Sequence, residues 1–201
     1  MAMYNWRQMS EIQRGEALRR RRLQQQPRHG PPHRRSYGPG QWMLTGACFE
    51  HQPWIGASLE RMETFEQELV QSLRGCCDEV VAWVILPNHY HVVVQTPDIR
   101  AALSVVGRIH GRTAHRWNGE EDQRGRQVWF RCAETIMKSE SHFWATLNYV
   151  HHNPVKHGYV DKWMDWPYSS AEEYIGQMGE PEASRIWKNY PINEYGRGWD
   201  E

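Results

Sequence analysis

The sequence lacks the features of a membrane-spanning or disulfide-stabilised protein. No apolar run approaches the length of a transmembrane helix, and the N-terminal segment has no apolar core of a secretory signal peptide. The four cysteines form neither a CxxC pair nor a zinc-finger spacing, so a structural zinc protein is the least favoured class. We therefore expect a protein of the reducing cytoplasm that contacts no membrane and carries no organic cofactor.

Charge is unevenly distributed, although the net charge is zero. Residues 1–40 hold nine arginines and two glutamates, whereas residues 41–201 hold fifteen Lys and Arg against twenty-two Asp and Glu. A segment so basic and so poor in aliphatic residues cannot bury a core, so we expect residues 1–40 to be a partly flexible arm. The arm fits nucleic-acid binding, with a solubilising tail as the alternative. Its centre is a run of four arginines: Arg19, Arg20, Arg21 and Arg22.

The hydrophobic pattern predicts one folded domain, residues 41–175, after this arm. Continuous β-branched runs indicate strands, and apolar residues at helical spacing indicate helices. The expected strands are 41–50, 79–86, 90–95 and 128–137, and the expected helices are 57–74 and 99–117. This β-α-β-β-α-β order predicts an α+β fold of the ferredoxin-like type, in which both helices cover one face of an antiparallel sheet.

A further helix is expected from about residue 139 to Pro154. Tyr149 lies about 120° away from the apolar stripe of this helix, and Asn153 lies one turn above the tyrosine. The pattern therefore predicts a helix that packs by one face and presents a tyrosine on another.

The remaining chain shows capping and aromatic signals. Ser169 or Ser170 is expected to cap a short helix, because a glutamate follows three residues later. Residues 176–201 are rich in Trp and Tyr, and we expect them to pack on the domain as a tail without chemistry of its own.

Two histidines with one residue between them follow the turn of the expected hairpin. Because side chains alternate along a strand, His89 and His91 point to the same face, and Tyr90 points to the other face and into the core. Two neutral imidazoles side by side form half of a metal site. The alternative is a pair of hydrogen-bonded, inert histidines at a sheet edge.

Arginines recur every fourth residue on the helix expected at 99–117. Arg108, Arg112 and Arg116 would form one positively charged stripe, which suits the phosphates of a nucleic-acid strand. A solvated helix face is the alternative explanation.

The motifs PNHYH and YVHHNPVKHGYV, followed by DWPYSS, resemble the signatures of single-tyrosine HUH transposases. The resemblance is closest to the REP-associated tyrosine transposases and covers residues 41–174. Either motif alone is weak, whereas both in this order, on an expected strand and an expected helix, are specific. The resemblance implies a ferredoxin-like fold, a divalent metal, single-stranded or hairpin DNA as substrate, and a covalent phosphotyrosine intermediate.

The resemblance also implies roles for individual residues. His89 and His91 would hold Mg²⁺ or Mn²⁺, and Tyr149 would attack the phosphorus to form a 5′-phosphotyrosine. Asn153 matches the position of a third metal ligand, although Asn before Pro154 is also a good start for a new helix.

Roles can also be expected for Lys156 and His152, and the resemblance bears on the oligomeric state. Lys156 fits a phosphate contact, and His152 fits a residue that orients the phosphate or the tyrosine. The resemblance favours a monomer, with the site completed within one chain, over a homodimer. Two other functions stay open: a catalytically silent HUH-fold protein that only binds DNA hairpins, and a nuclease that uses metal-activated water and leaves no protein–DNA adduct.

Overall fold

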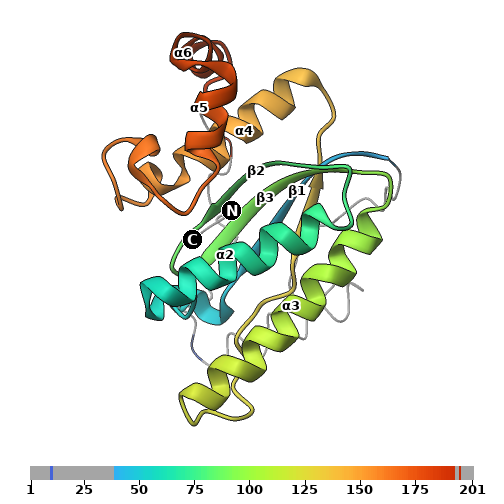
Figure 1. Ribbon diagram of the computed structural model, residues 1–201, viewed down its shortest axis with the longest axis vertical. Helices are drawn as coiled ribbons and strands as arrows, with labels where there is room; N and C mark the ends of the chain where they lie inside the picture. The colour runs from blue at the N-terminus through green and yellow to red at the C-terminus, as the bar shows by residue number, and fades with distance from the viewer. Residues whose placement is uncertain (1–9, 11–38, 193–194, 196–201) are drawn as a thin grey trace.

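A four-stranded antiparallel sheet with two helices on one face forms the body of the protein (Figure 1). The computed structural model describes Ser10, residues 39–192 and Tyr195. The sheet order is β2-β3-β1-β4, and the order along the chain is β-α-β-β-α-β. This arrangement confirms the predicted α+β, ferredoxin-like fold. The bounds are β1 Gly40–Ala47, α2 Leu59–Arg74, β2 Glu79–Ile85, β3 His89–Thr96, α3 Ile99–Glu120 and β4 Ala133–Ile136.

The two faces of the sheet bury separate apolar cores. Tyr90, Val92 and Val94 of β3 point toward α2 and α3, where Phe65 packs against the Tyr90 ring at 5.5 Å between centroids. Val93 points the other way, into a second core formed with α4 (Glu140–Lys156). Tyr90 is fully buried, as its alternation with the histidines predicts. The central strand β3 therefore belongs to both cores.

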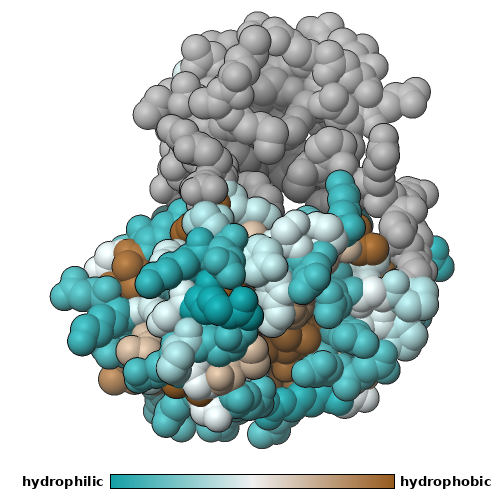
Figure 2. All heavy atoms as spheres, turned by 90° about the horizontal axis from the view of Figure 1, so that it is seen from above, coloured by the Kyte–Doolittle hydropathy of each residue, from teal (hydrophilic) through white to brown (hydrophobic). Residues whose placement is uncertain are grey.

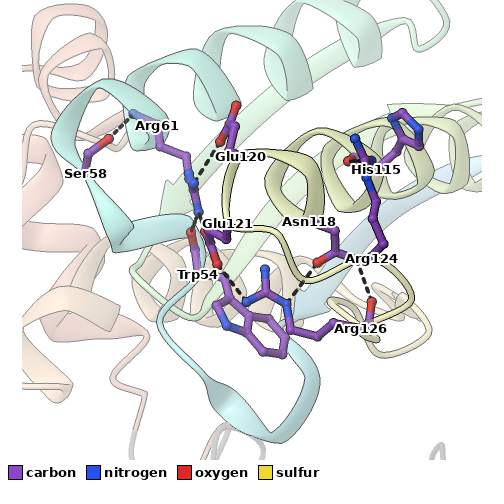
Figure 3. A network of polar contacts seen from close by, with 9 residues as sticks. All are labelled: Trp54, Ser58, Arg61, His115, Asn118, Glu120, Glu121, Arg124 and Arg126. Atoms are coloured by element: carbon purple, nitrogen blue, oxygen red, sulfur yellow. Dashed lines mark hydrogen bonds and ion pairs between the residues drawn. The ribbon is translucent and has the colours of Figure 1, made fainter.

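Helix α3 is longer than the spacing predicted. Residues 118–120 continue the helix, because Asn118 is buried and bonds both the backbone carbonyl and the guanidinium of Arg126. Arg61 of α2 then pairs with Glu120 and Glu121, and Arg126 also reaches Glu121 (Figure 3). This network of charges joins the start of α2 to the end of α3, so the helix continues three residues beyond its expected end at 117.

Strand β4 is shorter than expected and lies at the edge of the sheet. It pairs with β1 over only four residues, all of them half-buried. The preceding residues 128–132 stay outside β4, and Trp129 forms an isolated bridge with Cys48 just beyond β1.

Helix α4 does not end at Pro154. The proline lies inside the helix, and the chain turns only at Gly158, whose φ of +72° is the left-handed conformation that glycine adopts without a steric penalty. Gly158 N–H donates to Val155 O, and Tyr159 N–H donates to Pro154 O, which together form a Schellman motif. The prediction that Asn153 caps a new helix is therefore wrong.

The C-terminal part folds back on α4 through two short helices, α5 (Ala171–Met178) and α6 (Glu180–Asn189). Asn148 of α4 donates to the carbonyl of Tyr190 at 2.8 Å. The described part of the C-terminal segment therefore packs on α4. Trp199 and nearly all of the basic arm lie outside the described residues.

The expected capping box before α5 is wrong. Ser170 precedes the helix but makes no side-chain cap. Its buried hydroxyl instead accepts the Trp83 N–H of β2 at 2.9 Å and bonds His151 Nε2 at 2.9 Å. Ser169 makes the local contact, accepting the Ala171 N–H at 3.3 Å.

None of the described helices combines the length and the apolar character needed to cross a bilayer. The described residues on the face drawn in Figure 2 are mostly hydrophilic, with their apolar side chains in small patches.

Replacing Ser170 should destabilise the fold more than replacing Ser169. Ser170→Ala leaves the buried N–H of Trp83 without its partner, which costs about 1–3 kcal/mol in the free energy of unfolding. Ser169→Ala removes two half-buried local contacts, to the Ala171 N–H and to the Trp166 carbonyl, and orphans no fully buried group of the sheet, so it serves as the control. Urea denaturation of both variants measures the difference, and an equal or larger loss for Ser169→Ala would contradict this account.

Candidate active site

Strand β3 and helix α4 bring together four of the residues singled out in the sequence. His89 and His91 leave the same face of β3, with ring centroids 5.2 Å apart. Helix α4 crosses this face, so that the Tyr149 hydroxyl lies 3.5 Å from His91 Nε2 and Asn153 Oδ1 lies 3.0 Å from His89 Nε2. All four side chains are buried. The site joins residues about sixty positions apart within one chain.

The neighbours of the two histidines fix how the rings are turned. Asn88 Nδ2 donates to the carbonyl of His51, so its Oδ1 accepts the proton of His89 Nδ1 at 2.8 Å. On the opposite strand, Thr45 faces His91, and its hydroxyl lies 2.8 Å from His91 Nδ1. When this hydroxyl accepts from Nδ1, both rings carry their lone pair on Nε2, toward α4. Metal-ligating histidines are held in this way by a partner on the other nitrogen.

The amide of Asn153 fits a bound cation. Its Oδ1 and the lone pair of His89 Nε2 face each other at 3.0 Å, and its Nδ2 is buried without a hydrogen-bond partner. Two acceptors repel at this distance, and a cation between them would remove the repulsion. Adjacent ligands of an octahedral ion with bonds of about 2.1 Å are separated by about 3.0 Å. In the described part of the chain no three His, Cys, Asp or Glu side chains form a metal-binding group, so a third protein ligand beside His89 and His91 would have to be of another type, as Asn153 is.

Tyr149 is enclosed rather than presented to solvent. Its side chain is fully buried, which corrects the expectation of a helix that exposes the tyrosine on a free face. The ammonium of Lys156, two turns further along α4, lies 5.0 Å from the centre of the Tyr149 ring. Tyr195 packs edge-on against the same ring at 5.5 Å, with its own hydroxyl bonded to Thr146 and His142.

Three histidines at the C-terminal end of α4 take different positions, and only one of them adjoins the site. His152 stacks on Trp187 and bonds the carbonyl of Asn148, so the prediction that it orients the tyrosine does not fit. His151 bonds the hydroxyl of Ser170, just before α5, and none of the hydrogen bonds of the described residues joins it to His89 or His91. His157 is the one that approaches the site, with its ring 5.0 Å from that of His89. The extra turn of α4 beyond Pro154 places it there, which the sequence pattern did not reveal.

The arginine stripe lies on the other side of the sheet. Arg108, Arg112 and Arg116 belong to α3, which packs on the face opposite to His89 and His91. Two of them pair with Glu68 of α2, Arg112 at 2.6 Å and Arg116 at 3.4 Å. The stripe is therefore partly neutralised and is not part of the candidate site. Arg19, Arg20, Arg21 and Arg22 lie outside the described residues.

Two curated proteins are similar to this chain in sequence, although no protein-family model matches it. A Haemophilus influenzae protein named provisionally as a REP-associated tyrosine transposase is 34% identical over 114 residues, and an Escherichia coli REP-associated tyrosine transposase is 29% identical over 105. This chain is thus similar in sequence to proteins named REP-associated tyrosine transposases. The aligned segments cover 52% and 49% of this chain and 65% and 58% of the two relatives, which is less than two thirds of either.

A solved structure has the same fold. It is described as a REP-associated tyrosine transposase bound to a REP hairpin, and it matches 73% of this chain and 86% of its own with a TM-score of 0.58. At 20% sequence identity this match concerns the fold. The resemblance predicted from the two motifs is thus confirmed, together with the fold that it implies.

Acid should destabilise the protein through the histidines that α4 buries. Burial lowers the pKa of His152 from 6.5 to about 4 and that of His151 to about 3. Unfolded histidine binds its proton below pH 6.5 and the folded one does not, so stability is complete above pH 6.5 and falls as the pH drops toward 4. His152→Phe keeps a ring on Trp187 and should reduce this loss, on the order of 2 kcal/mol.

Thermal or urea unfolding across this pH range measures the loss. His115→Ala, at an exposed position of α3, is the control and should keep the wild-type pH dependence. An unchanged pH dependence in His152→Phe would refute the assignment.

Proposed function

We propose that this protein is an enzyme that cleaves and rejoins single-stranded or hairpin DNA with Tyr149 as the nucleophile. The observation that carries the proposal is the Tyr149 hydroxyl, 3.5 Å from the Nε2 of a histidine whose other nitrogen is already held by Thr45. The names of the two relatives and of the structural neighbour support a transposase acting on DNA hairpins.

The chain's own residues fit the expected phosphoryl transfer. The Tyr149 oxygen would attack the phosphorus and lose its proton, forming the bond of a 5′-phosphotyrosine. The bond to the 3′ oxygen breaks, and that oxygen takes up a proton and leaves as a 3′-OH. The covalent link conserves the energy of the phosphodiester, so attack by a 3′-OH can rejoin the strand without ATP. Strand transfer differs in this respect from hydrolysis.

A divalent metal, Mg²⁺ or Mn²⁺, is the proposed cofactor, held by His89, His91 and Asn153. When bound, it would neutralise charge on a non-bridging phosphate oxygen and make the phenolate accessible. Two imidazoles favour Mn²⁺ over Mg²⁺ by ligand preference.

Lys156 is the proposed cationic partner of the reacting groups. A tyrosine hydroxyl has an ordinary pKa of about 10 and is a weak nucleophile at neutral pH. The Lys156 ammonium beside the ring favours the phenolate and can also contact a phosphate oxygen. Its surroundings at the exposed end of α4 leave room for both roles.

The four proposed site residues come from one chain, which supports a monomer as the working unit. Tyr149 and Asn153 reach the histidines from a helix that follows β4 after only a few residues. A partner subunit is not required to bring the tyrosine to the metal ligands.

A silent DNA-binding protein is the second candidate, because Tyr149 is fully buried. In that case the hairpin would bind without any transfer to the tyrosine. The two candidates differ in whether a covalent protein–DNA species forms.

Tyr149→Phe should abolish the covalent species and spare DNA binding. The protein is incubated with end-labelled hairpin DNA taken from repeats that flank its own gene, with Mg²⁺, Mn²⁺ or EDTA, and run on a denaturing gel. A metal-dependent band of the size of protein plus DNA is expected from the wild type. Tyr190→Phe, which keeps the ring that stacks on Trp144 and the backbone carbonyl that bonds Asn148, is the control and should keep the band.

Three results would argue against the proposal. Cleavage that survives Tyr149→Phe would exclude the tyrosine as nucleophile. Free cleaved product without an adduct would indicate hydrolysis by water. Binding without cleavage would favour the silent protein.

Thr45→Val should weaken metal binding without disturbing the strand. Valine keeps the shape and strand preference of threonine but removes the oxygen that holds His91 Nδ1. Loss of such a partner typically weakens metal affinity by about tenfold to a hundredfold. Calorimetric titration with Mn²⁺ measures the change, with Thr135→Val in β4 as the control. Equal affinities for the two variants would show that Thr45 does not support a metal ligand.

A further inference from the structure

A row of aromatic rings leads from the candidate site out to the surface. The His157 ring lies 5.0 Å from that of His89, and the Tyr159 ring follows at 6.3 Å from His157. Trp166 lies 5.3 Å beyond Tyr159, and Tyr168 another 5.8 Å beyond Trp166. Consecutive rings are thus close enough for contact. The row begins at the buried His89, a candidate metal ligand, and continues past rings that solvent reaches.

The rings of this row that follow His89 are accessible to solvent. His157 and Tyr159 are exposed, and Trp166 is half-buried. Among the described residues the exposed large hydrophobic side chains are Leu59, Tyr159 and Met164, and Tyr159 is 43% exposed. Single exposed apolar side chains are common, but this one belongs to a row that begins at the site.

The rings are held in place before any ligand binds. The Schellman motif at Gly158 ends α4 and turns the chain, so that His157 and Tyr159 follow each other on the surface beside His89. Trp166 Nε1 donates to the carbonyl of Ile85 at the end of β2. The Ile85 N–H in turn donates to the carbonyl of Tyr168 at 2.8 Å. The row is therefore anchored to the sheet at one end and to α4 at the other.

The charge along the row does not suit a track for phosphates alone. Lys156 and Lys162 are exposed, and so are Asp161 and Asp165, so the segment carries as many acidic as basic side chains. Rings in a surface without excess charge attract the flat faces of nucleic-acid bases, which stack on aromatic side chains with little dependence on sequence. The chemistry of the row therefore fits bases.

We propose that His157, Tyr159 and Trp166 form a stacking surface for the bases of the single-stranded DNA that adjoins the phosphate attacked by Tyr149. The inference rests on the proposed function for the identity of the nucleic acid. It adds a binding surface outside the metal ligands and the nucleophile, and it explains why this turn carries aromatic rings on its exposed side.

The test is the affinity for a fluorescently labelled oligothymidine, measured by anisotropy for the wild type and two variants of Tyr159. Tyr159→Ala should lose about tenfold in affinity, within the range found when a stacking ring is removed. Tyr159→Phe keeps the ring and should bind as the wild type does. Leu59→Ala, an exposed apolar side chain on α2, is the matched control and should not change the affinity.

A second oligonucleotide, with abasic sites in place of the thymines, separates stacking from other effects. Tyr159→Ala should bind it as the wild type does, because no base remains to stack. The dependence of affinity on salt should be the same for Tyr159→Ala and the wild type, since no phosphate contact is removed. An equal loss on both oligonucleotides, or a loss for Tyr159→Phe as large as for Tyr159→Ala, would overturn the proposal.

The outcome is distinguishable from a failure of the proposed function. Wild-type protein that forms the covalent adduct while Tyr159→Ala binds oligothymidine normally would refute the stacking surface alone. Ring-dependent binding without any adduct would retain the stacking surface and remove the catalytic function. A wild type that neither binds oligothymidine nor forms the adduct would refute both.

Discussion

The packing of α4 across the sheet face that carries His89 and His91 is the contact on which the candidate site depends. Leu147 and Val150 bury their side chains against Val84 and Val93 of the sheet. This apolar contact holds the helix at a distance at which Tyr149 and Asn153, on the same side of α4, reach the two histidines. Hydrophobic burial thus determines the geometry of a polar site.

Hydrogen bonds from neighbouring polar side chains fix the orientation of the two histidine rings. Asn88 and Thr45 bond the Nδ1 atoms of the two histidines, so Nε2 of both rings is directed at α4. The alternation of β3 places Tyr90 on the opposite side, where burial and a hydrogen bond to His110 fix it. Because β3 is packed on both faces, its histidines have little freedom to turn away. A rigid ligand pair of this kind suits a metal, whose bond lengths tolerate little variation.

The order of strands and helices could be predicted because each element has a clear local pattern. The β-branched runs that flank the histidines predicted β2 and β3, and the helical spacing of Phe65 and Leu69 predicted α2. The ends of elements were predicted less well, since they depend on distant partners. Asn118 extends α3 through its bonds to Arg126, and Ser170 leaves its capping role to hold Trp83. Neither partner is adjacent in sequence.

The sequence by itself determined the alternation that puts His89 and His91 on one face, the helix that carries Tyr149, and the motifs that relate the chain to REP-associated tyrosine transposases. Only the tertiary structure decided that Asn153 faces His89, that Glu68 pairs with the arginine stripe, and that His157, rather than His152, adjoins the site. The physical reason is that periodicity along a chain fixes the direction of a side chain within its own element. Which side chains meet depends on how the elements pack and where each helix ends.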